Sequence, residues 1–184
     1  VDPEFAVEGE RLGDIDYEHF VASGHEDYQW HWPADEWEAI SLNYTSGTTG
    51  APKGVLHTQA AMVANIDAAI DAQGLDATTR TLAVLPLFHV GGLCIQVLPT
   101  LAAGGVVRLQ PRFDAGAWFD DVAAWRPTTC LLVPATMRSL IDHPRWADAD
   151  LSSLRFINSG SQIVPRALIE AFHARGVPVA QVYG

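Results

Sequence analysis

One segment of the sequence, YTSGTTGAPKG at 44–54, has the residue types needed to hold a polyphosphate. Its three glycines let the backbone take positive φ angles and approach a ligand closely. Successive exposed N–H groups in such a loop form a concavity that binds anions. Lys53, the only lysine of the chain, adds a positive charge on a flexible stem. A helix is predicted to follow, and its free N–H groups and positive dipole end would favour the same anion. The hydroxyl donors of this loop are Thr45, Ser46, Thr48 and Thr49.

This phosphate-binding segment differs from the Walker P-loop. The Walker motif requires a lysine followed by a hydroxyl residue, whereas Lys53 is followed by Gly54 and Val55. A flexible surface loop rich in small polar residues is the alternative interpretation.

Two later segments carry further candidate site residues. In LPLFHVGGL (85–93), Phe88 and His89 follow an apolar run, and the glycines after them leave space for a ligand. A histidine at a strand end that is satisfied by the backbone is the simpler alternative. In INSGSQIVP (157–165), small residues follow another apolar run, and an ordinary strand–turn–helix connection would also explain that pattern. The candidate pocket residues are Phe88, His89, Gly91, Gly92, Ser159 and Ser161.

The elements that must position these residues alternate along the chain. Short apolar runs bounded by turn residues predict buried strands. They lie at 39–44, 81–87, 105–110, 128–134, 154–160 and 178–184. Segments with helical spacing of apolar residues lie at 57–73, 91–103 (with a kink at Pro99), 115–125 (capped by Asp114), 135–142 and 165–176. The fold class is therefore α/β, with a mainly parallel sheet covered by helices on both faces. Ligands gather at the carboxyl ends of such strands, where we expect the loops 45–54, 88–92 and 159–164.

Composition restricts the class of partner. The chain has 184 residues, a hydrophobic content of 48% and a net charge of −11, and all of this excess lies within residues 1–43. We expect no nucleic-acid binding, because the chain shows no basic stripe. Cys94 and Cys130 lie in apolar runs and are predicted to be buried free thiols, which suits a cytoplasmic location. The sequence contains no transmembrane segment, and its histidines do not have the spacing of metal ligands. Asp120 and Asp121 are expected on a solvated face of a helix.

The three segments together resemble the signatures of the adenylate-forming (AMP-binding) superfamily, which includes acyl-CoA synthetases, luciferases and adenylation domains of peptide synthetases. DEWEAISLNYTSGTTG (35–50) is most similar to the acyl-CoA synthetase and fatty-acid–CoA ligase branch. The 157–165 segment departs from the frequent S-G-G-A-P form, because Ser161 and Gln162 stand where Gly and Ala are common. The resemblance implies that His89 lies at the carboxylate substrate. It also implies ATP contacts from Thr45, Ser46, Gly47, Thr48, Thr49, Gly50, Lys53, Ser159, Gly160, Ser161, Tyr183 and Gly184.

The resemblance further implies a two-step reaction. A carboxylate, expected to be a fatty acid, attacks the α-phosphate of ATP with the help of Mg²⁺ and gives acyl-AMP and pyrophosphate. The thiol of CoA then attacks the acyl-AMP, takes the acyl group and releases AMP. An adenylation domain that feeds a carrier protein and a non-catalytic nucleotide-binding fragment remain alternatives. We expect an acidic, aromatic lead segment at 1–38 and part of the large N-terminal AMP-binding domain at 39–184. Because the family's Mg²⁺-binding glutamate and C-terminal domain are missing, the chain is expected to be an inactive portion of a longer protein. A missing neighbour strand predicts an exposed apolar sheet edge, through which the isolated chain is expected to self-associate.

Overall fold

The computed structural model describes residues 13–45 and 50–183 and divides the chain into two compact units, Val1–Glu36 and Trp37–Gly184. The first unit contains one short helix, α1 (Tyr17–Ala22). Asp16 begins this helix, because its carboxylate accepts a hydrogen bond of 2.9 Å from the backbone N–H of His19. The second unit carries the sheet and all candidate site residues that the structure describes.

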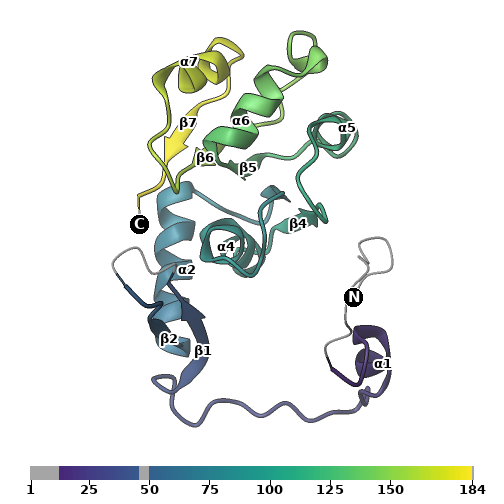
Figure 1. Ribbon diagram of the computed structural model, residues 1–184, viewed down its shortest axis with the longest axis vertical. Coiled ribbons are helices and arrows are strands. Elements are labelled where there is room, and N and C mark those ends of the chain that lie inside the picture. The colour runs from purple at the N-terminus through teal and green to yellow at the C-terminus, as the bar shows by residue number, and fades with distance from the viewer. Residues whose placement is uncertain (1–12, 46–49, 184) are drawn as a thin grey trace. The chain divides into compact units, whose positions relative to one another are not determined.

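A parallel five-stranded sheet forms the centre of the second unit, with strand order β4-β3-β5-β6-β7 (Figure 1). Every residue of the middle strand is buried, which explains its continuous apolar sequence. The order reverses direction at β3, so that β4 and β5 lie on opposite sides of it. The strands are β3 (Arg80–Ala83), β4 (Val106–Leu109), β5 (Thr129–Leu132), β6 (Phe156–Ser159) and β7 (Val179–Gln181).

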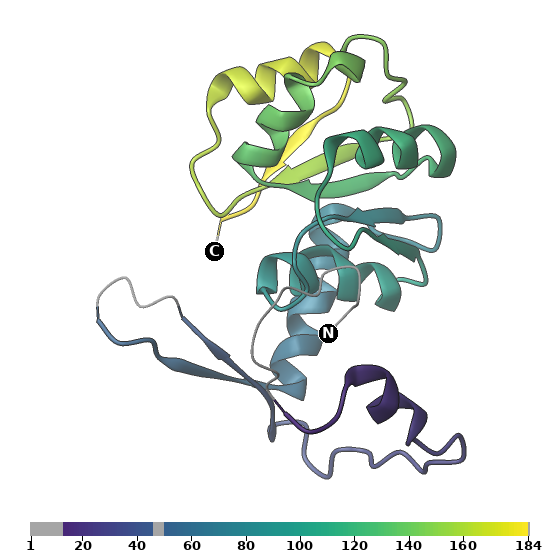
Figure 2. The ribbon, with the colours of Figure 1, turned by 45° about the vertical axis from the view of Figure 1, so that its right-hand side comes forward.

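Helices cover both faces of this sheet, as the sequence predicted (Figure 2). On one face lie α5 (Ala115–Trp125), α6 (Pro134–Ile141) and α7 (Arg166–Ala174), with the short 3₁₀ turn η3 (Pro144–Trp146) after α6. Trp118, Phe119 and Phe172 from these helices are buried in the main apolar core. On the other face lie α2 (Gln59–Gln73), the turn η2 (Leu93–Val97) and α4 (Leu98–Ala102). No helix in the described part of the chain is long and apolar enough to cross a membrane.

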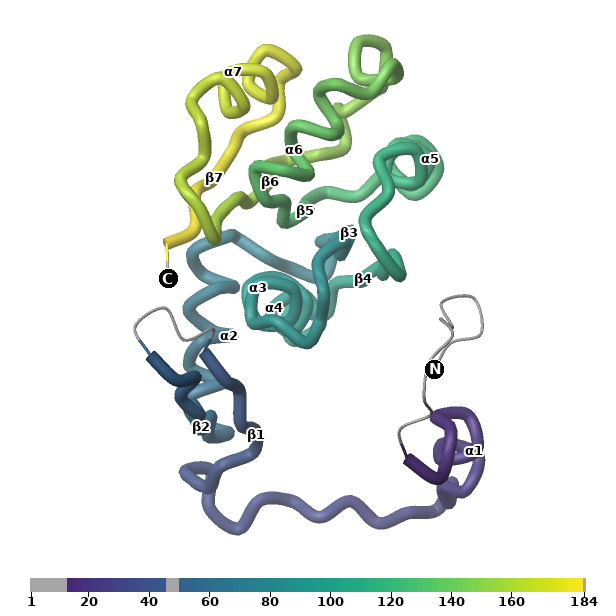
Figure 3. The backbone as a smooth tube through the Cα atoms, in the orientation of Figure 1, coloured from purple at the N-terminus to yellow at the C-terminus, as the bar shows by residue number. Residues whose placement is uncertain are grey.

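The first predicted strand is present, but its predicted environment is wrong. Residues Ala39–Tyr44 form β1, which pairs antiparallel with β2 (Gly54–Thr58) in a separate two-stranded ribbon (Figure 3). The side chains of Ile40 and Leu42 are exposed. The loop 45–54 therefore connects two ribbon strands and does not leave the carboxyl end of the parallel sheet. The predicted helix at 57–73 begins at Gln59, because Thr58 is extended and its hydroxyl accepts a hydrogen bond of 3.1 Å from Ala61 N–H.

The predicted helix at 91–103 is broken into three pieces. A short α3 (Val90–Gly92) leads into η2, which has π-helical hydrogen bonding, and α4 follows with Pro99 in its first turn. Pro99 lacks the N–H that would donate to the Ile95 carbonyl in a continuous α-helix, so regular α-helical hydrogen bonding cannot run through this position.

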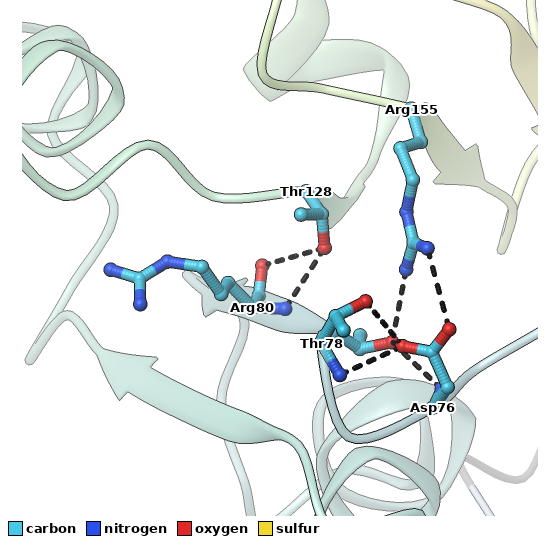
Figure 4. A network of polar contacts seen from close by, with 6 residues as sticks. Asp76, Thr78, Arg80, Thr128 and Arg155 are labelled. Atoms are coloured by element: carbon cyan, nitrogen blue, oxygen red, sulfur yellow. Dashed lines mark hydrogen bonds and ion pairs between the residues drawn. The ribbon is translucent and has the colours of Figure 1, made fainter.

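Polar side chains connect three strands at the amino end of the sheet (Figure 4). The backbone N–H of Arg80 donates to the Thr128 hydroxyl at 2.9 Å, which ties the start of β3 to the start of β5. The Arg155 guanidinium, just before β6, donates to the Thr79 hydroxyl at 3.0 Å and lies 3.9 Å from the Asp76 carboxylate. This end of the sheet is therefore cross-linked by hydrogen bonds on the side away from the candidate site.

Candidate active site

The phosphate-binding segment is closed at its base by two hydrogen bonds between Thr45 and Lys53. The Thr45 N–H donates to the Lys53 carbonyl at 3.0 Å, and the Lys53 N–H donates to the Thr45 hydroxyl at 3.1 Å. The side chain of Lys53 is exposed, and Gly50 has a φ of 149°. The remaining predicted phosphate contacts, Ser46, Gly47, Thr48 and Thr49, lie outside the described residues.

The ribbon explains why a glycine follows this loop. A Cβ atom at Gly54 would lie 2.9 Å from the Leu42 Cδ1 atom and 3.7 Å from the Tyr44 ring, because β1 and β2 are paired there. β2 lies between the loop and α2 in the sequence, so the loop does not lead directly into that helix as predicted.

His89 begins helix α3, and its ring is oriented by the backbone. Its Nδ1 accepts a hydrogen bond of 2.9 Å from the Gly91 N–H. An Nδ1 that accepts carries no proton, so in the neutral ring the proton lies on Nε2. His89 can therefore present an N–H donor to a ligand oxygen.

Gly92 is required by a close approach of two backbone segments. A Cβ atom at this position would lie 2.2 Å from the carbonyl oxygen of Pro86 and 2.8 Å from that of Leu85. No such contact is tolerated, because backbone atoms cannot move away as the end of a side chain can. The glycine thus keeps the start of α3 packed against the segment that follows β3.

The third segment lies where β6 ends beside the end of β7. The Val182 N–H donates to the Ser159 carbonyl at 2.9 Å, and a Cβ atom on Gly160 would lie 2.6 Å from the Val182 carbonyl oxygen. Ser161 follows with a φ of 65°, a left-handed conformation that is uncommon for residues other than glycine. The Ser159 hydroxyl is buried and has no hydrogen-bond partner among the described residues.

These segments meet around one cavity of about 270 Å³ at the carboxyl ends of β5 and β6. His89, Gly160, Ser161 and Tyr183 line it together, although they come from three separate stretches of sequence. The parallel topology explains the meeting, because the carboxyl ends of parallel strands lie at the same edge of the sheet. Two of the three predicted loops, 88–92 and 159–164, are therefore placed at this edge.

The other candidate residues lie around or outside this cavity. The side chain of Tyr183 is fully exposed, so both faces of its ring are free for stacking. Phe88 is also exposed and does not line the cavity. Ser159 is buried and does not line the cavity, and Gly184 lies outside the described residues.

A larger hollow of about 530 Å³ lies between the ends of β3 and β4, but few of the predicted site residues line it. Its walls are residues 83–88 and 109–113, and Phe88 is the one pocket candidate among them. A second hollow of about 280 Å³ lies between β1 and residues 87–94. It shares His89, Val90 and Cys94 with the site cavity, so this segment separates two cavities.

The site cavity has an uncharged lining. Among the described residues that form its walls, none is Asp, Glu, Lys or Arg. Partial burial raises the pKa of the Cys94 thiol, so this side chain is neutral at physiological pH. In the described part of the chain, no group of three His, Cys, Asp or Glu residues is arranged to hold a metal ion. The cavity can therefore accommodate the apolar body of a ligand, with His89 as a polar donor at its edge.

Comparison with known proteins agrees with this arrangement. The profile of the family described as AMP-binding enzyme matches residues 6–184. The chain belongs to the AMP-binding enzyme family. This membership bears out the adenylate-forming resemblance that the three sequence motifs carried.

Two curated relatives of this AMP-binding chain are CoA ligases. An indoleacetate–CoA ligase of Aromatoleum aromaticum is 54% identical over 145 residues, which cover 79% of this chain and 28% of the relative. A feruloyl-CoA synthase of Amycolatopsis is 40% identical over 143 residues, which cover 78% of this chain and 29% of the relative. The chain thus spans less than a third of the length of these relatives.

A solved structure supports the AMP-binding fold. The o-succinylbenzoate CoA synthetase of Bacillus subtilis, in complex with ATP and a magnesium ion, superposes with a TM-score of 0.80 and 28% identity. The alignment covers 92% of this chain and 35% of that protein. The parallel sheet with helices on both faces is therefore the fold of this part of an acyl-CoA ligase.

Sequence reasoning missed several residues that line the cavity of this AMP-binding chain. Asn65 from α2 and Cys94 from η2 form part of its wall, together with Leu131 and Val182. Asn65 had a weak signal, since it is an amide within an alanine-rich helix. Cys94 and Leu131 had none, because apolar runs do not reveal which side chains face a cavity.

Proposed function

We propose that the protein to which this chain belongs activates a carboxylic acid with ATP and transfers the acyl group to CoA. The observation that carries this proposal is the cavity where His89, Gly160–Ser161 and Tyr183 meet. These residues come from three motifs that are separate in sequence and that resemble signatures of one reaction. The membership of the AMP-binding family supports the adenylation step. The two curated relatives, both named for CoA products, support CoA over a carrier protein as acceptor.

The residues have distinct proposed roles. Thr45, Gly50 and Lys53, with the loop between them, bind the phosphates of ATP, and Mg²⁺ neutralises charge on those phosphates. Tyr183 stacks on the adenine, and the backbone of 159–161 lies against it. His89 donates its Nε2–H to a carboxylate oxygen of the acid, which orients the other oxygen for attack. CoA approaches from the hollow on the far side of the His89–Cys94 segment.

We further propose that the acid is aromatic, although the sequence resemblance favoured a fatty acid. The relatives named for indoleacetate and for a feruloyl product support an aryl acid. The cavity supports the same choice, because its uncharged walls and volume of about 270 Å³ suit a compact ring system.

Carboxylate-dependent ATP–pyrophosphate exchange on the full-length protein tests this function. The panel contains indole-3-acetate, ferulate, phenylacetate, octanoate and palmitate, and the 184-residue chain is assayed beside the full-length protein. We expect exchange with the aryl acids, followed by acyl-CoA formation when CoA is added. Exchange with the fatty acids alone would overturn the aromatic assignment, and no exchange with any acid would overturn the proposed function.

A further inference from the structure

One wall of the site cavity has an unusual backbone. Residues Leu93–Val97 form a π-helical turn, in which the Leu98 N–H donates to the Leu93 carbonyl. His89, Val90, Gly91, Cys94 and Ile95 line the cavity from this turn and the short helix before it. Turns of this kind are frequent at functional sites.

The π turn leaves two neighbouring carbonyl groups without their usual backbone donors. In an α-helix the Cys94 carbonyl would accept from Leu98, but that N–H is bonded to Leu93. The next residue, Pro99, has no N–H, so it can donate neither to Cys94 nor to Ile95. Buried or partly buried carbonyls need partners, and here the main chain of the turn does not provide the usual ones.

Two amide side chains of α2 take the place of these donors. The Asn65 Nδ2 group donates to the Cys94 carbonyl at 3.0 Å, and the Gln73 Nε2 group donates to the Ile95 carbonyl at 2.8 Å. Asn65 and Gln73 are eight residues apart, so they fall within the same stripe of the helix. Two adjacent carbonyls thus receive side-chain hydrogen bonds from one neighbouring helix.

Gln73 also connects the turn to the sheet. Its Oε1 atom accepts a hydrogen bond of 2.6 Å from Asn158 Nδ2 in β6 and one of 3.4 Å from Gln96 Nε2. Gln96 in turn donates to the Thr129 hydroxyl in β5 at 2.8 Å. β6 leads directly into Gly160 and Ser161 on the opposite wall of the cavity. The amide of Gln73 therefore links both walls.

We propose that Asn65 and Gln73 are positioning residues that replace the donor missing at Pro99 and hold the π turn in the shape that the acid cavity requires. The proposal rests on the proposed function only in naming the ligand as an acid. Neither residue is assigned a part in bond making. Their effect reaches the substrate through the backbone of Cys94 and Ile95, and through His89 at the start of the same wall.

The test uses the full-length protein with Asn65→Ala, Pro99→Ala and the double variant. Asn65→Ala removes one hydrogen bond from the turn, and we expect KM for the acid to rise about fivefold to tenfold, with kcat and KM for ATP little changed. Pro99→Ala supplies a backbone N–H at residue 99, which can donate to the Cys94 carbonyl in the i→i−5 pattern of the existing π turn. The double variant is therefore expected to regain most of the wild-type KM.

A second readout is independent of activity. The rate at which iodoacetamide alkylates Cys94, followed by mass spectrometry of its peptide, reports the opening of the turn because this thiol is only partly buried. Asn65→Ala should accelerate this reaction and the double variant should slow it again. The control is Thr100→Val, which breaks the buried 2.7 Å hydrogen bond between Thr81 and Thr100 outside the cavity wall. It should lower the melting temperature without changing either readout.

Two results would overturn the positioning role. One is an unchanged KM and alkylation rate in Asn65→Ala. The other is a double variant as impaired as Asn65→Ala, which would mean that Asn65 contacts the acid directly. If the wild-type protein shows no exchange with any acid, the proposed function fails, and the alkylation rates still decide whether the amides hold the turn.

Discussion

Ser161 has the backbone conformation that most residues avoid, at a position that lines the site cavity. Ser161 has a φ of 65°. The residue before it, Gly160, lies so close to the Val182 carbonyl oxygen that a Cβ atom would not fit. The neighbouring backbone therefore fixes the direction of the turn and leaves Ser161 strained. The similar family segment more often has glycine at this position, and glycine would take this φ angle without strain.

Ser161→Gly is expected to stabilise the folded protein by about 0.5–1 kcal/mol, because glycine adopts left-handed angles without a steric penalty. The melting temperature of the full-length variant measures this change. Ser139→Gly is the matched control, since Ser139 lies in α6 with helical geometry and the same substitution there should lower stability. A lower melting temperature for Ser161→Gly would show that the serine hydroxyl outweighs the strain.

The two cysteines should differ in reactivity. Complete burial raises the pKa of Cys130 to about 12, whereas Cys94 is only partly buried. Because the thiolate is the reactive form, iodoacetamide at pH 8 should label Cys94 and leave Cys130 unmodified until the protein unfolds. Peptide mass spectrometry with and without urea measures both sites. Equal labelling of the two thiols in the folded protein would contradict the buried position of β5.

At the residue scale, sequence reasoning found the polar site residues better than the supporting ones. His89, Gly160, Ser161 and Tyr183 were predicted from motifs and line one cavity. Asp121 was expected in solvent, but it is buried and forms an ion pair of 2.7 Å with Arg108 from β4. A pairing between distant segments has no local signature, so the sequence could not indicate it.

At the scale of elements, Gly92 shows how tightly α3 packs after β3. Gly92→Ala should destabilise the protein by about 2 kcal/mol or more, because its Cβ would overlap backbone oxygen atoms. Gly91→Ala is the comparator, since its Cβ would meet the His89 ring at 3.0 Å and that ring can move. Thermal unfolding of both variants measures the difference. Equal small losses would mean that the segment before α3 can shift aside.

The sequence predicted the elements well where a single periodic pattern decided them. The helix at 115–125 has the predicted bounds, and Asp114 caps it through a hydrogen bond of 2.8 Å to the Ala117 N–H. The strand at 39–44 was predicted with the right bounds and the wrong environment. A short apolar run does not distinguish a strand of a buried parallel sheet from one of an exposed ribbon. The helical span predicted at 91–103 is present at 90–102, but the sequence predicted only a kink at Pro99 and not the change from π-helical to α-helical hydrogen bonding just before it.

For the whole molecule, two carboxylates make stability depend on acid pH. Hydrogen bonds from the Thr78 side chain and backbone hold the pKa of Asp76 below its usual value of 3.8, with a further effect of Arg155. Hydrogen bonds from Ser152 and Arg126 hold the pKa of Asp150 well below its usual range. A lowered carboxyl pKa contributes stability that is fully present above the unfolded pKa and is lost as the pH falls through the folded pKa.

Asp76→Asn and Asp150→Asn are therefore expected to lower the melting temperature at pH 6, and their difference from wild type should shrink below about pH 4. Melting curves between pH 2.5 and pH 7 would check this, because that range extends about one unit or more to each side of the ordinary carboxyl pKa. Asp148→Asn is the control, because Asp148 is exposed and its carboxylate has no hydrogen bond or ion pair among the described residues. A difference that stays constant across the pH range would mean that these carboxylates do not act through their charge.

The hydrogen bonds at the amino end of the sheet bear on how the sequence of such a protein can vary in evolution. Two hydrogen bonds connect β3, β5 and β6 at the end of the sheet opposite the site cavity (Figure 4). The Arg80 N–H donates to the Thr128 hydroxyl, and the Arg155 guanidinium donates to the Thr79 hydroxyl. None of these four residues lines the cavity, so substitutions that widen or narrow the cavity do not remove these hydrogen bonds. Residues that line the cavity can therefore vary at one end of the sheet while these hydrogen bonds continue to hold the strands together at the other end.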